Sequence, residues 1–313
     1  MKTITTVFTF LFLLSSLCYS QVRTPFNQEL ASPTNMFPAL TGWHGGLQNT
    51  VNYRNQWPGI PATYVFYNVG VDGYAQKLKS GFGLNLAHNR IGTGIVNINK
   101  ADLNWSPKIR LKNELIIMPS VSVGYFQISI DWAQTTFNDR LSRWLIDESS
   151  TGGVINSNVN KLSLGSGLGL VYKDAFLVAN VADVTQPSLS FFTNNEHRLA
   201  RTYSLLLGKN FLANNWTFTP RMSYMRWGEF NTLNIGMNAQ YKGFYLGANY
   251  VWDDRVGIAG GAEISNRVRF SYGYDFTTSR LGFTHIGSHE FMVRVWLFKD
   301  RADNQFLSNL PLI

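Results

Sequence analysis

The sequence predicts an all-β fold, a transmembrane antiparallel up-and-down β-barrel of about 14 strands. Three observations lead to this prediction. Charged residues make up 15% of the 313 positions, whereas an ordinary soluble domain has about 25%. No stretch after the amino terminus reaches the roughly 18 consecutive apolar residues of a membrane helix. Apolar and polar residues alternate with period two along most of the chain, and only helices and closed barrels satisfy every backbone group in lipid.

The alternation is clearest over residues 231–241. Its apolar face consists of Leu233, Ile235, Met237, Ala239 and Tyr241, and every residue between them is polar or glycine. Residues 244–253 and 268–277 repeat the pattern. These apolar faces run for about nine to eleven residues and end in aromatic side chains, as membrane strands do, whereas strands of soluble sandwiches are nearer five or six residues.

The same reading divides the chain into candidate strands. We expect 94–105 and 106–112 to be one strand interrupted at Pro107, which keeps the number of strands even. The candidate strands are 47–54, 62–72, 80–88, 94–105 with 106–112, 115–132, 161–173, 175–185, 199–212, 216–227, 231–241, 244–253, 256–265, 268–277 and 288–298.

The connections between these strands sort by length. Alternate connections are tight, at 112–114, 173–174, 213–215, 242–243 and 266–267. All the long ones (133–161, 186–198 and 278–287) fall on the other parity. Because short turns face the periplasm and long loops face outward in such barrels, the sequence predicts a protein of the cell outer membrane with both termini in the periplasm.

The segments outside the barrel have distinct compositions. Residues 1–20 form a predicted signal peptide, with Lys2 ahead of an apolar run over 7–14. Acylation of Cys18 as a lipoprotein is an alternative, although Leu17 is larger than that processing favours. Residues 21–46 are irregular and rich in proline and glycine, which makes them a candidate plug for the barrel of residues 47–298. Residues 299–313 form a short, rather apolar periplasmic tail, either a peg for a partner or a disordered end.

The residues give no sign of enzymatic chemistry. His289 and Glu290 begin like a zinc-protease motif, but no second histidine follows at the required spacing. The glycines of 165–169 do not have the dinucleotide-binding spacing. We therefore expect no enzyme, no metal site and no cofactor. The net charge of +8 comes from scattered single cations, which favours contact with anionic outer-membrane lipid over nucleic acid.

Two polar clusters border the predicted connections. The first is a candidate binding element or a hairpin anchored by an interfacial tryptophan, and it comprises Tyr53, Arg54, Gln56 and Trp57. The second, Asp131 with Trp132, closes a strand at the mouth of the longest loop.

A third cluster alternates along the last strands, opposite their apolar faces. Asp275 with Arg269, Arg294 and Glu290 would form either an ionic ladder inside the barrel or an ordinary solvated lumen.

These clusters also carry a resemblance to the PorP/SprF family, outer-membrane proteins of the type IX secretion system in gliding and related Bacteroidetes. The similar segments are 36–42, Tyr53-Arg54 with Gln56-Trp57, 61–64, 89–92, 130–132, 172–187, 274–276 and Gly287-Ser288-His289-Glu290. The resemblance implies a component that docks or anchors exported proteins through their C-terminal sorting domains and contacts periplasmic secretion components. A passive or substrate-specific pore is the alternative, and a purely structural barrel a third possibility.

Overall fold

The computed structural model describes residues 26–30, 33–60, 63–111, 114–131, 157–189, 198–265, 267–279 and 287–298. The predicted signal peptide, Trp132 and the 299–313 tail lie outside the described residues. The strands are β1 (Leu47–Gln56), β2 (Tyr64–Ala75), β3 (Ser80–Ile91), β4 (Val96–Pro107), β5 (Ile109–Arg110), β6 (Leu115–Ile130), β7 (Asn158–Tyr172), β8 (Ala175–Ala182), β9 (Thr202–Lys209), β10 (Phe211–Ala213), β11 (Trp216–Trp227), β12 (Phe230–Tyr241), β13 (Phe244–Val251), β14 (Arg255–Ser265), β15 (Val268–Thr277) and β16 (Ser288–Phe298).

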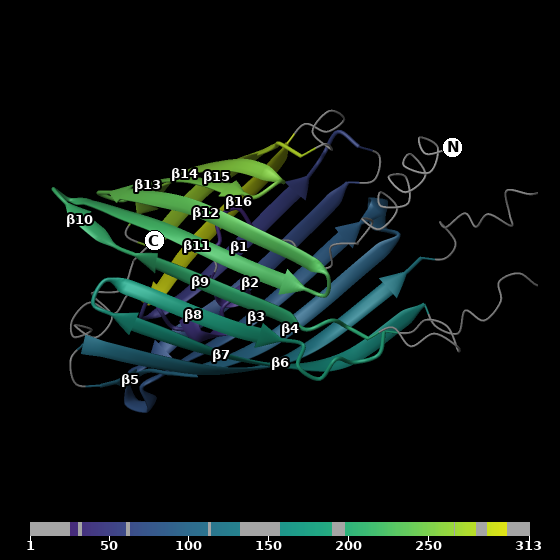
Figure 1. The fold of residues 1–313 in the computed structure, drawn as a ribbon, viewed down its shortest axis with the longest axis horizontal. Coiled ribbons are helices and arrows are strands. Elements are labelled where there is room, and N and C mark those ends of the chain that lie inside the picture. The colour runs from purple at the N-terminus through teal and green to yellow at the C-terminus, as the bar shows by residue number, and fades with distance from the viewer. Residues whose placement is uncertain are drawn as a thin grey trace, which may run out of the picture.

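These strands form one closed antiparallel barrel (Figure 1). Apart from the short β5 and β10, each strand pairs with the strands before and after it in sequence, so that β4 pairs with β6 and β9 with β11, and β1 pairs with β16. The short β5 and β10 continue β4 and β9 after breaks at Lys108 and Asn210, so the barrel has 14 strands, as predicted. The expected interruption beside Pro107 is confirmed, whereas the break at Asn210 was not foreseen within the predicted strand 199–212.

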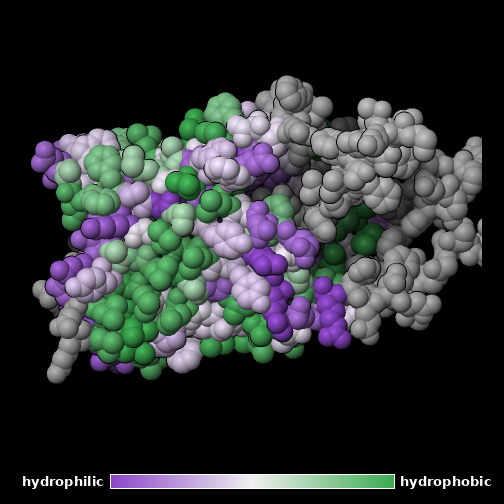
Figure 2. Space-filling view, viewed as in Figure 1, coloured by the Kyte–Doolittle hydropathy of each residue, from purple (hydrophilic) through white to green (hydrophobic). Residues whose placement is uncertain are grey.

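The outer wall is apolar because every second residue of each strand points away from the lumen. Large exposed side chains such as Leu103, Leu164, Ile235 and Leu246 stand on this face. Figure 2 shows apolar side chains gathered over β7, β8 and β9, where the wall faces the viewer. No helix in the described ranges is long and apolar enough to cross a membrane.

The connections divide between the two ends of the barrel. The tight-turn end carries the connections at 76–79, 111–114, 173–174, 214–215, 242–243 and 266–267, and the long-loop end carries the others. Lys242 and Gly243 have φ values of 44° and 86°. Positive φ at both central residues is the geometry of a two-residue hairpin turn whose twist matches that of its strands.

Residues 26–30 and 33–46 lie inside the barrel. They include two short 3₁₀ turns, η1 (Pro33–Asn35) and η2 (Pro38–Leu40). Phe37, Leu40 and Trp43 are buried against apolar side chains that face the lumen. Those wall residues are Ile116, Met118, Val171, Phe176, Val178, Leu206 and Tyr245. The core of the protein therefore lies between this segment and one side of the barrel wall.

The close fit of this segment to the wall depends on Gly81 of β3. A Cβ atom at this position would lie 2.0 Å from the carbonyl oxygen of Thr41 and 3.1 Å from the amide nitrogen of Gly42. We therefore expect Gly81→Val to lower the free energy of unfolding by about 1 to 3 kcal/mol, because the backbone of the segment must shift. Urea unfolding followed by tryptophan fluorescence in detergent micelles measures the change.

Gly59 provides the matched control for this prediction. It lies in the β1–β2 connection, and a Cβ atom there would meet nothing within 4 Å. Gly59→Val should change the free energy of unfolding by less than about 0.5 kcal/mol. Equal effects of the two substitutions would show that the segment does not press against β3 at this point.

Candidate functional site

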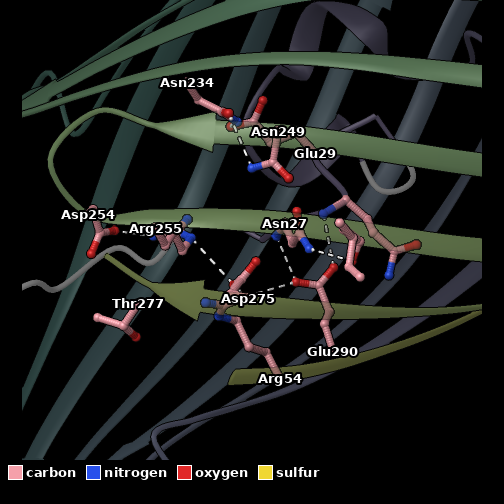
Figure 3. A network of polar contacts seen from close by, with 12 residues as sticks. Asn27, Glu29, Arg54, Asn234, Asn249, Asp254, Arg255, Asp275, Thr277 and Glu290 are labelled. Atoms are coloured by element: carbon pink, nitrogen blue, oxygen red, sulfur yellow. Dashed lines mark hydrogen bonds and ion pairs between the residues drawn. The ribbon is translucent and has the colours of Figure 1, made fainter. Parts of the chain in front are cut away.

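An ionic cluster lies on the lumen side where the first and last strands of the barrel meet (Figure 3). Nη1 of Arg54 on β1 lies 2.5 Å from Oδ2 of Asp275 on β15 and 3.3 Å from Oε2 of Glu290 on β16. All three side chains are about 1% exposed. Arg255 on β14 adds a second cation, with its Nε 3.4 Å from Oδ2 of Asp275. Two buried carboxylates therefore face two guanidinium groups, which compensates their charges.

Strand register creates this cluster. Arg54 pairs directly with Glu290 across β1 and β16, and Asp275 pairs with Ser288 across β15 and β16. Residues at alternate positions of a strand share a face, and the buried, lumen-facing set on β16 starts at Ser288 and continues with Glu290. Closure of the barrel is what brings residue 54 beside residue 290.

Glu290 also binds the backbone of the segment inside the barrel. Its carboxylate accepts hydrogen bonds from the backbone N–H groups of Asn27 at 2.7 Å and Gln28 at 3.1 Å. Ser271 on β15 donates a hydrogen bond to the side-chain oxygen of Gln28. The carboxylate thus satisfies two buried backbone donors while Arg54 compensates its charge, so the cluster fixes residues 27 and 28 in place.

Glu29 makes a second attachment, to β11 and β12. Its carboxylate accepts hydrogen bonds from Ser223 Oγ at 2.8 Å and from Asn234 Nδ2 at 2.9 Å. Nε of Arg221 lies 3.8 Å from the same carboxylate, and Nη1 of Arg221 donates to Asn238 at 2.8 Å. Consecutive residues of one irregular segment are therefore bound by two separate groups of strands, β15 and β16 for Gln28 and β11 and β12 for Glu29.

The segment remains attached as it runs towards the tight-turn end. The carbonyl oxygen of Ala39 accepts hydrogen bonds from Ser106 Oγ at 3.0 Å and Lys108 Nζ at 2.7 Å. The N–H of Gly42 donates to Asp72 at 2.8 Å. Asn104 and Asn180 donate to the carbonyl oxygens of residues 34 and 36. The described chain therefore runs through the lumen from the cluster near the long-loop end to the start of β1 at the tight-turn end.

A sequence model described as "Type IX secretion system membrane protein PorP/SprF" matches residues 19–295 of the chain. The chain belongs to the PorP/SprF family. With its barrel fold, this makes the protein an outer-membrane component of the type IX secretion system. No curated protein matches this PorP/SprF chain.

Solved structures similar to the PorP/SprF chain share little sequence with it. The Pseudomonas putida toluene transporter TodX is 13% identical, with a TM-score of 0.48 over 84% of this chain and 91% of that one. The outer-membrane protein Omp33 of Acinetobacter baumannii is 8% identical, with a TM-score of 0.46 over 81% of this chain and 99% of that one.

The ionic ladder expected from the PorP/SprF sequence is built differently from the prediction. Asp275 and Glu290 do meet, but their cations are Arg54 and Arg255. Arg269 pairs instead with Glu263 at 2.7 Å. Arg269 and Arg294 both lie over the ring of Trp296, at 5.5 and 5.6 Å from its centre. The predicted ladder is therefore two separate groups, because Arg294 lies four residues beyond Glu290 along β16, about 13 Å away.

The remaining candidate residues lie on different surfaces. Trp57 donates from Nε1 to Thr277 Oγ1 at 3.1 Å and stands edge-on to Tyr64. Asp131 is exposed at the long-loop end and donates its backbone N–H to Ile95. Gln56 and Ser288 are buried on the lumen side, and Gly287 adjoins Asp275. Tyr53 lies on the outer face against the ring of Phe291. His289 lies on the same outer face and is hydrogen-bonded to Tyr272.

The sequence did not single out several residues of these contacts, namely Asn27, Gln28 and Glu29 in the segment, Asp72 and Arg221 on the wall, and Arg255 in the ionic cluster. Glu29 gave the most accessible signal, since it is a lone carboxylate in an otherwise uncharged irregular stretch over residues 24–46. Within the described ranges, no group of three or more His, Cys, Asp or Glu side chains is arranged to hold a metal ion. The contacts described above bind a polypeptide segment in the lumen through ionic and amide groups.

Proposed function

We propose that this PorP/SprF protein is a docking component of the secretion system and not a conduit for solutes. The observation that carries the proposal is the segment of residues 26–30 and 33–46, whose backbone and side chains are hydrogen-bonded to β16, to β12 and to Lys108 between β4 and β5. A barrel filled in this way works through its rims and loops. Its long-loop end would dock or anchor exported proteins through their C-terminal sorting domains, and its tight-turn end would contact periplasmic components.

The shape of the lumen near the long-loop end supports docking on that side. A cavity of about 70 Å³ lies there, lined by Phe66, Ile98, Phe126 and Met225 among others. Buried apolar residues in pockets of this kind commonly carry much of the binding energy at protein interfaces. A partner seated on the long loops could therefore place an apolar side chain in this part of the lumen.

The proposal includes the orientation of the barrel. Tight turns would face the periplasm, as short turns do in bacterial outer-membrane barrels. The 299–313 tail follows β16, which ends at the tight-turn end, so it is proposed as a peg for a periplasmic partner. Residues 27 and 28 lie beside Glu290 near the long-loop end, so in this orientation the described start of the segment would lie towards the outside, and a periplasmic amino terminus is not part of the proposal.

Affinity purification of the intact barrel from its own cells tests this function. We expect it to recover periplasmic secretion components and an exported protein with a C-terminal sorting domain. A matched chain ending at residue 298 should lose the periplasmic components and keep the exported protein. Recovery of neither class, together with steady ion current through the full-length protein in planar bilayers, would replace docking by the pore alternative.

A further inference from the structure

The outer wall over β12 to β15 contains an apolar groove of about 430 Å³. Its floor is formed by small residues, Ala239, Ala248 and Gly260. Register places Gly260 between Leu246 on β13 and Tyr272 on β15. The large side chains of Leu246 and Tyr272 therefore flank a glycine, which has no side chain, and the space above Gly260 forms the groove.

The groove lies within the apolar outer face of the barrel. Met237, Leu246 and Ile258, which line it, are each at least half exposed. Because the surrounding medium at this height is hydrocarbon, the occupant must be apolar along its length. A hydrocarbon chain lying in the groove contacts wall atoms on several sides, and these dispersion contacts add up where a flat wall offers fewer.

The groove leads to cations at the tight-turn end of the same strands. Lys242 occupies the β12–β13 turn, exposed, with Nζ 5.2 Å from the centre of the Tyr241 ring. Arg267, also exposed, immediately precedes β15. Aromatic rings beside cations mark the level of lipid headgroups in membrane proteins. Glu263 is the nearby carboxylate, and it is already paired with Arg269.

The opposite end of these strands has the reverse charge. The β13–β14 connection carries Asp253 and Asp254, and Glu229 is exposed in the neighbouring β11–β12 connection. Asp254 is paired with Arg255, and the exposed Arg226 near Glu229 offsets that charge, which leaves Asp253 to repel an anion. Charge complementarity therefore gives an amphiphile one orientation in the groove, with its anionic end beside Lys242 and Arg267.

From these contacts we propose that the groove is a binding site for an anionic phospholipid, with one acyl chain along Ala248 and Gly260 and the phosphate between Lys242 and Arg267. Assignment to the phospholipid leaflet rests on the proposed orientation, in which the tight turns face the periplasm. The site is independent of docking, so failure to recover protein partners would leave it intact.

Native mass spectrometry of the full-length protein, with phosphatidylglycerol or phosphatidylcholine added to the detergent solution, tests the site. We expect phosphatidylglycerol to bind about tenfold more tightly, since two cations contact its phosphate and no ammonium group neutralises it. Ala248→Leu fills the groove from an exposed position and should lower phosphatidylglycerol binding to the level of phosphatidylcholine. Lys242→Asn with Arg267→Gln should do the same through the headgroup, and asparagine suits the positive φ of 44° at position 242.

Two matched variants control for general effects on the wall and on charge. Ala179→Leu enlarges an exposed alanine on the outer face of β8, and Arg226→Gln removes an exposed cation at the long-loop end. Both should leave phosphatidylglycerol binding unchanged. The proposal is overturned if the two phospholipids bind equally, if Ala248→Leu has no effect while the charge variants do, or if added lipid A displaces phosphatidylglycerol from the groove.

Discussion

Replacing Arg54 by methionine is expected to lower the free energy of unfolding by about 3 to 5 kcal/mol. Methionine keeps much of the volume but removes the cation that lies against Asp275 and Glu290, whose side chains are 1% exposed. Of these two carboxylates Arg255 is paired with Asp275, at 3.4 Å, so Glu290 would keep a buried charge without its guanidinium partner. The loss would also weaken the hold of Glu290 on residues 27 and 28.

Urea unfolding in detergent micelles measures this loss, and two companion variants interpret it. The triple variant Arg54→Met, Asp275→Asn, Glu290→Gln should recover a large part of the stability, because no uncompensated charge is left in the lumen. Arg90→Met removes an exposed arginine near the long-loop end and should change the free energy by less than about 0.5 kcal/mol. A triple variant less stable than the single one would mean that the carboxylates do not depend on Arg54.

The wall of the barrel was predictable because lipid imposes a simple rule on it. A strand with hydrocarbon on one side must be apolar at every second residue, and that period reads directly from segments such as 231–241. The break beside Pro107 was also readable, since proline cannot donate a ladder hydrogen bond. The break at Asn210 was not, because the residues around it keep an ordinary strand composition.

The filled lumen left a weaker trace in the sequence. β8 is apolar on both faces, with Leu177 outward and Phe176 and Val178 inward. A strand apolar on both faces is covered on both, so this run is a sign of packing inside the barrel that the sequence analysis did not use. Lumen-facing positions of the other strands are mostly polar. The irregular segment that hydrogen-bonds to them has no hydrophobic periodicity from which its position could be predicted.

The ionic cluster shows what periodicity cannot supply. Arg54 and Glu290 were each singled out, but in different groups, because they are 236 residues apart in the chain. Only closure of β1 onto β16 brings them together, and the exact register of that closure decides that Arg54 and not Arg294 faces the carboxylates. The resemblance to the family covered Arg54, Asp275 and Glu290 but not Arg255, and it gave no geometry.

Deleting residues 26–45 is expected to turn a closed barrel into a conducting one. The segment fills the lumen with buried groups such as Phe37, Leu40 and Trp43, while the barrel strands hydrogen-bond to each other and do not need it for their ladders. Fourteen strands enclose a lumen wide enough for water once it is emptied. The polar positions that bind the segment, including Arg54, Arg221 and Asp72, would then line an aqueous path.

Planar-bilayer recordings compare the deletion variant with the full-length protein, after heat-modifiable migration in gel electrophoresis has established that both are folded. We expect rare, brief currents from the full chain and steady current from the deletion variant. Should the shortened chain fail to fold, Leu40→Ala with Trp43→Ala in the full-length protein loosens the same packing and should give frequent openings. Phe211→Ala, at an exposed outer position of β10, is the matched control and should stay as closed as the parent. Steady current through the unaltered chain would show that the segment leaves an open path for ions beside it. The protein would then conduct solutes in addition to any docking role.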